Sequence, residues 1–157
     1  MRGVLERGIP DDFGSFFKRA RFFRFRAVTV DGERTNLYDY ENDVIRPLGE
    51  PRVHFALNCM VRDCPRLPRV PFSGDKLETQ LEAAAVEFFN SEKYVRVDDP
   101  EKVVRVSAIL DFYTEDFTPD GRAQNLITYL NHFRREAVSS DYKLRFLDYD
   151  WTINQQP

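Results

Sequence analysis

The sequence predicts a single α+β domain, in which a mixed or antiparallel sheet packs against three to four helices. Short stretches in which apolar and polar residues alternate are typical of half-buried strands, and they recur at 23–30, 94–106 and 143–150. Longer stretches, at 73–89 and 121–133, instead repeat apolar residues at helical spacing. The 157 residues amount to one domain, so we predict that residues 1–157 fold together.

The composition excludes several classes of protein. With 42% apolar residues and a net charge of -3, the chain has neither the basic footprint of a nucleic-acid-binding protein nor the composition of a disordered tail. No apolar run approaches the roughly 18 residues of a membrane span. We therefore predict no nucleic-acid and no membrane partner. The N-terminus lacks the apolar core of a secretory signal, so the chain as written is expected in the cytoplasm, unless a preceding segment is missing.

The first elements are a hairpin and a helix. Residues 1–14 form a polar entry segment, and residues 18–30 alternate basic and apolar side chains as a half-buried strand does. One solvated strand face explains the arginines better than a nucleic-acid surface. Asp31-Gly32 predicts a hairpin turn to a return strand at 33–35. Asn36 then caps a helix that Pro47 stops.

The middle of the chain predicts a strand, a loop and a helix. Residues 53–58 alternate as in a short central strand, which would aim the loop carrying Cys59 and Cys64. Three prolines disfavour regular structure up to Phe72. Ser73 then caps a helix whose buried face holds Leu77, Leu81, Ala84, Ala85 and Phe88.

The second half predicts a hairpin of residues 94–97 and 103–106, joined by a polar turn. A short helix at 108–114 follows, with Ser107 as its cap. A longer helix begins near 121, and a last strand spans 143–150.

Three motifs resemble those of the domain of unknown function 547 family, and the resemblance covers residues 35–154. They are His-Phe-Ala-Leu-Asn-Cys59 with Cys64-Pro65, Val-Ser-Ala-Ile-Leu-Asp-Phe-Tyr-Thr-Glu-Asp-Phe117, and Leu-Asp-Tyr-Asp-Trp-Thr-Ile-Asn154. The family is named for lacking an established activity. The resemblance implies a distant likeness to papain-like and transglutaminase-like folds, and so a cysteine-dependent hydrolase or transferase.

The chain departs from the family pattern at three places. It has Tyr40-Glu41-Asn42 where the family usually has Ile-Glu-His. Met60 and Val61 replace small residues, and Asp63 replaces a serine. An earlier helix with an Asn-Ala-Tyr-Asn-like motif is not found, so we expect the chain to lack the family's N-terminal helix. These departures leave open whether this member is active.

A catalytic interpretation makes Cys59 the nucleophile and His54 the base that keeps it as thiolate, with Glu41 or Asp150 orienting the imidazole. An extended strand would hold His54 and Cys59 roughly 16 Å apart, so the chain would have to reverse sharply after Leu57. Cys64, on a returning loop, could reach His54 instead.

Other interpretations of the two cysteines stay open. They can be packed thiols or one disulfide bridge, in a non-enzymatic interaction or structural domain. Asp116 is expected as a buried acceptor for arginine or backbone donors, with a structural and not a catalytic role. A zinc site is disfavoured by the cysteine spacing and by the position of His132 on a separate helix, so we predict no metal and no cofactor. On either interpretation the substrate or partner is a peptide or protein.

Overall fold

The computed structural model describes residues 13–154, which form two compact units. The first unit holds the described residues up to Gly49, residues 59–62, and the described residues from Asp150 onward. The second holds residues 50–58 and 63–149. Most of the predicted entry segment, residues 1–12, lies outside the described residues. That the whole chain folds as one domain stays a prediction.

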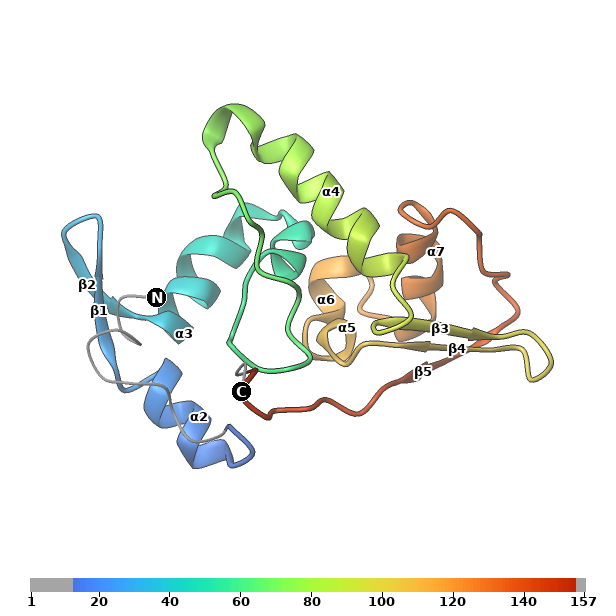
Figure 1. Ribbon diagram of the computed structural model, residues 1–157, viewed down its shortest axis with the longest axis horizontal. Helices are drawn as coiled ribbons and strands as arrows, with labels where there is room; N and C mark the ends of the chain where they lie inside the picture. The colour runs from blue at the N-terminus through green and yellow to red at the C-terminus, as the bar shows by residue number, and fades with distance from the viewer. Residues whose placement is uncertain (1–12, 155–157) are drawn as a thin grey trace. The chain divides into compact units, whose positions relative to one another are not determined.

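The first unit contains an N-terminal helix, a hairpin and a run of short helical turns (Figure 1). Asp31 and Gly32 have φ of 51° and 84°, the positive values that a tight two-residue hairpin turn requires, so the turn prediction is confirmed. The elements are α2 (Phe16–Phe23), β1 (Ala27–Val30), β2 (Glu33–Asn36), α3 (Leu37–Asp39), the π-helix η1 (Tyr40–Ile45) and the 3-10 helix η2 (Arg46–Leu48).

The prediction of a strand from residue 18 was wrong over the first part of that stretch, which forms α2. The rings of Phe22 and Phe23 both pack against Phe13, at centroid distances of 5.1 and 5.2 Å. Consecutive side chains of a strand point to opposite faces, whereas a helix can bring both toward one neighbour. Packing on Phe13 therefore favours the helix, and the strand begins only at Ala27.

The predicted cap at Asn36 is confirmed, because its side chain accepts a hydrogen bond from the Asp39 backbone N–H at 2.8 Å. The helical path does not stop at Pro47, which lies inside η2, where it needs no N–H donor. It ends at Gly49, whose φ of 71° is left-handed.

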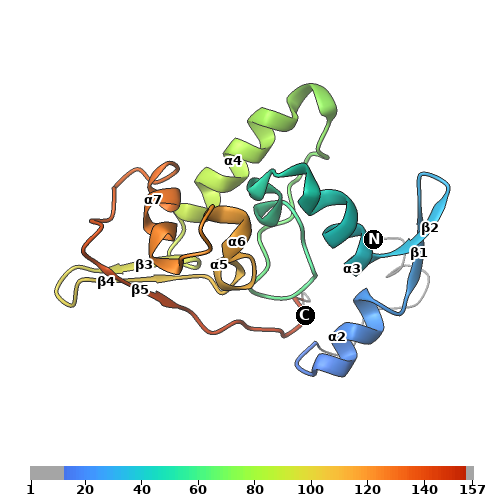
Figure 2. The same ribbon diagram turned by 180° about the vertical axis from the view of Figure 1, so that it is seen from behind.

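The second unit combines a three-stranded sheet with several helices (Figures 1 and 2). β3 pairs with β4 antiparallel, with Val95 opposite Val106, and β5 runs parallel beside β4. The elements are η3 (Pro51–Phe55), η4 (Gly74–Lys76), α4 (Leu77–Phe89), β3 (Val95–Asp98), β4 (Val103–Val106), α5 (Ile109–Phe112), α6 (Thr114–Phe117), η5 (Ala123–Asn125), α7 (Leu126–Asn131) and β5 (Lys143–Phe146).

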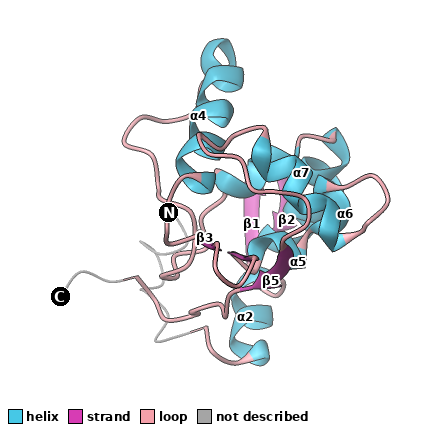
Figure 3. Cartoon of the chain, turned by 90° about the vertical axis from the view of Figure 1, so that its right-hand side faces the viewer, coloured by secondary structure: helices cyan, strands magenta, loops and turns pink. Residues whose placement is uncertain are grey.

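The α+β class is confirmed, but the predicted strands do not share one sheet. The first hairpin forms a two-stranded sheet by itself, and only the second hairpin and the last strand pair with each other. α4 is the longest helix of the described residues (Figure 3). Its buried face follows the predicted spacing at Leu81, Ala85 and Phe88, whereas Leu77 is 44% exposed.

The prediction of a strand at residues 53–58 was wrong, because residues 51–55 form the 3-10 helix η3. Pro51 occupies a first helical position, where its fixed φ is favourable. The Glu50 side chain accepts a hydrogen bond from the Arg52 N–H at 3.0 Å and so caps the helix. These local signals outweigh a short alternation, and the tight turn buries both His54 and Phe55.

Candidate functional site

His54 lies in η3 and is held by the helical segment α5–α6. Its Nε2 is 2.7 Å from Oδ2 of Asp116, and since an ionised carboxylate can only accept, Nε2 carries the proton. The Tyr113 ring stacks on the imidazole at 3.9 Å between centroids, and Phe117 meets it edge-on at 5.4 Å. At 3% exposure, His54 is a buried imidazole held in position by neighbours from a distant part of the sequence.

Both cysteines are disulfide-bonded, so in this state neither Cys59 nor Cys64 is a thiol. Of the alternatives that the sequence leaves open, the structure shows the bridge. Cys64 is 4% exposed, and its surroundings are aromatic. The Tyr94 hydroxyl donates to the Cys64 carbonyl at 2.9 Å and the Tyr149 hydroxyl donates to its sulfur at 3.5 Å. Burial, with a further contribution from Asp63, raises the pKa of Tyr149 well above its usual range, so this hydroxyl keeps its proton.

Glu41 and Asp150, the two carboxylates predicted to orient the imidazole, lie in the first unit. Glu41 belongs to η1 and is half-buried. Asp150 is exposed, and the side chain and backbone N–H of Thr152 hold its pKa below the usual range. Their role toward His54 stays a prediction. Asp116 instead shares a hydrogen bond with the His54 ring, whereas we predicted arginine or backbone donors for it.

Arg52 ties η3 to α4 through two carboxylates of α4, and it also pairs with Glu50, the cap of its own helix. Its guanidinium lies 2.6 Å from Glu50, 2.7 Å from Glu78 and 3.1 Å from Glu82. The hydrogen bonds from Arg52 hold the pKa of Glu50 below its usual range, and they do the same for Glu78. This cluster fixes the short helix that carries His54 and Phe55.

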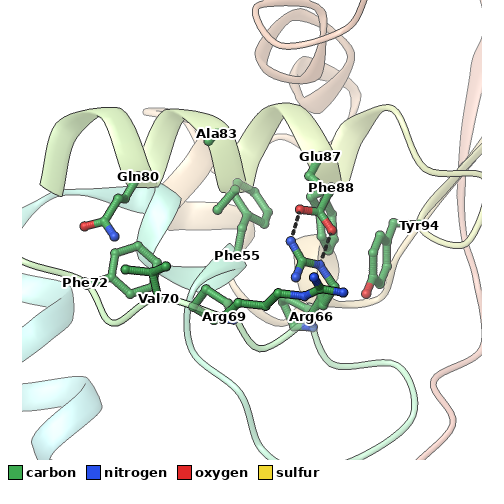
Figure 4. Close-up of a pocket in the computed structure, with 13 residues that line it drawn as sticks. Phe55, Arg66, Arg69, Val70, Phe72, Gln80, Ala83, Glu87, Phe88 and Tyr94 are labelled. Carbon is green, nitrogen blue, oxygen red and sulfur yellow. Dashed lines mark hydrogen bonds and ion pairs between the residues drawn. The ribbon is translucent and has the colours of Figure 1, made fainter. Parts of the chain in front are cut away.

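A groove of about 620 Å³ lies in the second unit, between α4 and the proline-rich loop (Figure 4). Phe55 and Phe88 contribute buried apolar surface, and Arg66 closes one end by pairing with Glu87 at 2.6 and 2.7 Å. The lining residues are Phe55, Pro65, Arg66, Pro68, Arg69, Val70, Phe72, Gln80, Ala83, Ala84, Glu87, Phe88 and Tyr94. Neither His54 nor a cysteine is among them.

Residues 13–154 contain no group of three His, Cys, Asp or Glu side chains that could hold a metal ion. Over the same residues, no helix is both long enough and apolar enough to cross a membrane.

The comparison with family models gives one match, to the family described as "Protein of unknown function, DUF547", over residues 1–89. This is more than half of the chain. The chain belongs to the DUF547 family. A search of curated proteins and a search of solved structures each found no match. The part matched to DUF547 includes His54 and both cysteines, whereas Asp116 lies outside it.

Proposed function

We propose that this DUF547 chain is a protein-interaction domain that binds a peptide segment of a partner protein in the groove beside α4. The observation that carries the proposal is the groove itself, an apolar hollow of about 620 Å³ whose lining includes no thiol and no histidine. This volume lies within the range of about 300–1,000 Å³ that is usual for binding pockets.

The lining of the groove indicates the chemistry of the peptide. Val70 is 65% exposed, and Phe72 is half-buried beside it, so apolar surface remains open to a ligand (Figure 4). Arg69 is exposed at the same groove and makes no ion pair within residues 13–154, unlike Arg66, which is paired with Glu87. An apolar peptide side chain next to an acidic one complements this surface.

The state of the cysteines supports binding over catalysis. A thiol hydrolase needs a thiolate, and in the disulfide-bonded chain neither Cys59 nor Cys64 can supply one. We therefore favour an interaction domain with linked cysteines over an enzyme.

Selection from a random ten-residue peptide display library tests the proposal, with affinities of the selected peptides measured by fluorescence polarisation. Ala83→Trp fills the groove from α4, and Thr79→Trp places the same side chain on an exposed position of the same helix outside the lining. We expect acidic and apolar peptides that bind A83W at least tenfold more weakly and T79W unchanged. Failure to select peptides, or equal binding to A83W and wild type, would reject the groove as the site.

A second candidate is a cysteine-dependent hydrolase or acyltransferase, of papain-like or transglutaminase-like ancestry, that requires the reduced chain. The observation that favours it is the bond between His54 and Asp116, because a carboxylate that holds an imidazole in position is the arrangement that orients the base beside a catalytic thiol. In this candidate Cys59 is the nucleophile, with Cys64 as the alternative thiol and Glu41 and Asp150 as further carboxylates.

Labelling of the reduced chain with iodoacetamide at pH 6 to 7, read by mass spectrometry, tests this candidate. A catalytic thiol would react much faster than free cysteine, and His54→Gln would remove the difference. If neither cysteine is labelled preferentially, the candidate is rejected.

A further inference from the structure

One face of α2 and the residues that follow it combines exposed aromatic rings with cations and has no acidic residue. We call this set, Phe17, Lys18, Arg21, Arg24 and Phe25, the basic-aromatic face. Phe17 is 82% and Phe25 is 76% exposed, far more than a soluble protein usually leaves of two neighbouring phenylalanines. From Ser15 to Arg26 the sequence contains five basic residues and no Asp or Glu.

The helical path brings these residues onto one side. The backbone N–H of Arg24 and that of Phe25 both donate to the Ala20 carbonyl, at 2.9 and 3.1 Å, so Phe25 lies in the turn that closes α2. Phe17 and Arg21 are four positions apart in α2 and therefore lie one above the other, and Phe25 follows in the turn that closes the helix. The opposite side is occupied by Phe22, which is 6% exposed and packs on Phe13.

The arginines of this segment divide into two groups. Arg19 donates to the Phe13 carbonyl at 2.7 Å and lies over Trp151 at 4.3 Å, and Arg26 lies over Phe22 at 4.7 Å, so these two belong to the packing of the first unit. Arg21 and Arg24 are exposed. Arg24 lies over the ring of Tyr38 at 4.8 Å, a contact that keeps its positive charge at the surface.

We propose that the basic-aromatic face binds peripherally to a membrane surface that contains anionic lipids. The charged residues from Ser15 to Arg26 are all basic, and the exposed Arg21 and Arg24 favour an anionic partner. The exposed rings of Phe17 and Phe25 favour an apolar layer beside that charge. The interface of a bilayer offers both, with lipid phosphates above and the acyl boundary just beneath. A helix that lies in this interface does not need the length of a membrane span. The prediction of no membrane partner rested on the lack of a span, and this proposal departs from it.

Single-stranded nucleic acid also combines negative charge with apolar faces, but it fits this surface less well. Proteins that bind it stack bases on aromatic side chains within a positively charged groove, whereas these rings protrude from the outer side of a helix.

Co-sedimentation of the full chain with vesicles tests the proposal, comparing pure phosphatidylcholine with phosphatidylcholine that contains about 30% phosphatidylserine. We expect binding only to the anionic vesicles. Phe17→Ser with Phe25→Ser, and separately Arg21→Glu with Arg24→Glu, should each weaken binding at least tenfold. The matched controls are Leu67→Ser and the pair Arg122→Glu and Arg135→Glu, which alter exposed residues of the second unit and should bind as wild type does.

Circular dichroism melts establish that each variant is folded before its binding is interpreted. No binding to anionic vesicles, or equal loss in the control variants, overturns the proposal. If the serine variant still binds, the cations alone account for the binding, and this result also overturns the proposal. Tighter binding to a fluorescein-labelled single-stranded RNA than to vesicles would assign the face to nucleic acid instead. Since A83W changes only the groove, its vesicle binding should equal that of wild type, which separates this proposal from the peptide proposal.

Discussion

Replacing Asp116 by alanine removes the described carboxylate partner of the His54 imidazole. The bond spans 2.7 Å, and the side chains of His54 and Asp116 are 1% and 21% exposed, so solvent screens it only in part. Hydrogen bonds to charged groups contribute about 1.5–3 kcal/mol when they are buried. Because Asp116 keeps some contact with water, we expect D116A to lower the free energy of unfolding by about 2 kcal/mol.

The assay is urea unfolding followed by circular dichroism, with Glu115→Ala as the matched control. Glu115 is the exposed neighbour of Asp116 in α6, so its replacement should change stability by less than about 0.5 kcal/mol. For a domain of this size, the loss in D116A corresponds to a melting temperature lower by roughly 4–8 °C.

A double-mutant cycle isolates the pair from other effects of the substitution. His54→Phe keeps a ring that can stack on Tyr113 but has no Nε2 proton to donate. We expect a coupling energy of about 1.5 kcal/mol or more between His54 and Asp116. A coupling energy below about 0.5 kcal/mol, or a D116A variant no less stable than E115A, would refute the view that this bond fixes the imidazole.

Three further predictions concern the disulfide, the arginine cluster and a buried hydroxyl. Reduction with dithiothreitol should lower the free energy of unfolding by about 2 kcal/mol, because it removes the loop-closure constraint that the disulfide places on the unfolded chain. The same treatment should not change the stability of the Cys59→Ser and Cys64→Ser double variant, and an equal loss in wild type and double variant would contradict this prediction. The low pKa of Glu50 contributes stability that is present above its ordinary pKa of 4.5 and is lost as the pH falls through the lower folded-state value. The difference in the free energy of unfolding between wild type and Arg52→Met, measured by urea titration, should therefore shrink as the pH falls from about 5 to about 3. A difference that stays constant over this range would count against the role of Glu50. Tyr129→Phe should raise stability by up to about 1 kcal/mol, because its buried hydroxyl has no hydrogen-bond partner among residues 13–154. Tyr94→Phe should lower stability by about as much, because that hydroxyl bonds to the Cys64 carbonyl, and thermal melts that rank the two variants in the opposite order would exclude this explanation.

Elements with strong local signals could be predicted from the sequence. α4 has helix-forming residues and a long apolar period, and the hairpin of β3 and β4 has two β-branched runs around a polar turn. The turn at Asp31-Gly32 needs positive φ at two positions, which these residue types tolerate. In each case the decisive interactions lie within a few residues of one another.

The errors arose where two patterns fit one stretch. The alternation of Phe and Arg after residue 18 is compatible with a strand and with an amphipathic helix, and the packing of Phe22 and Phe23 on Phe13 decides between them. At residues 51–55 a proline at the helix start and a glutamate cap override an alternation that is too short to be reliable.

The partner of His54 could not be predicted, because Asp116 is 62 positions away in the sequence. The sequence around Asp116 does not indicate which donor this partly buried carboxylate will meet in the folded chain. The same holds for Arg52, whose partners Glu78 and Glu82 lie on α4 and become neighbours only after η3 packs against it.

The parallel pairing of β5 with β4 has a consequence for the order of folding. β3 and β4 can pair as soon as residue 106 has been synthesised, but the other edge of β4 waits for residues 143–146 and for the helices between them. Until then, β4 presents an open edge rich in valine, of the kind that pairs with other chains. We expect the yield of native protein to depend on how quickly α5 to α7 form and bring β5 to that edge, so that aggregation during synthesis is set by this step.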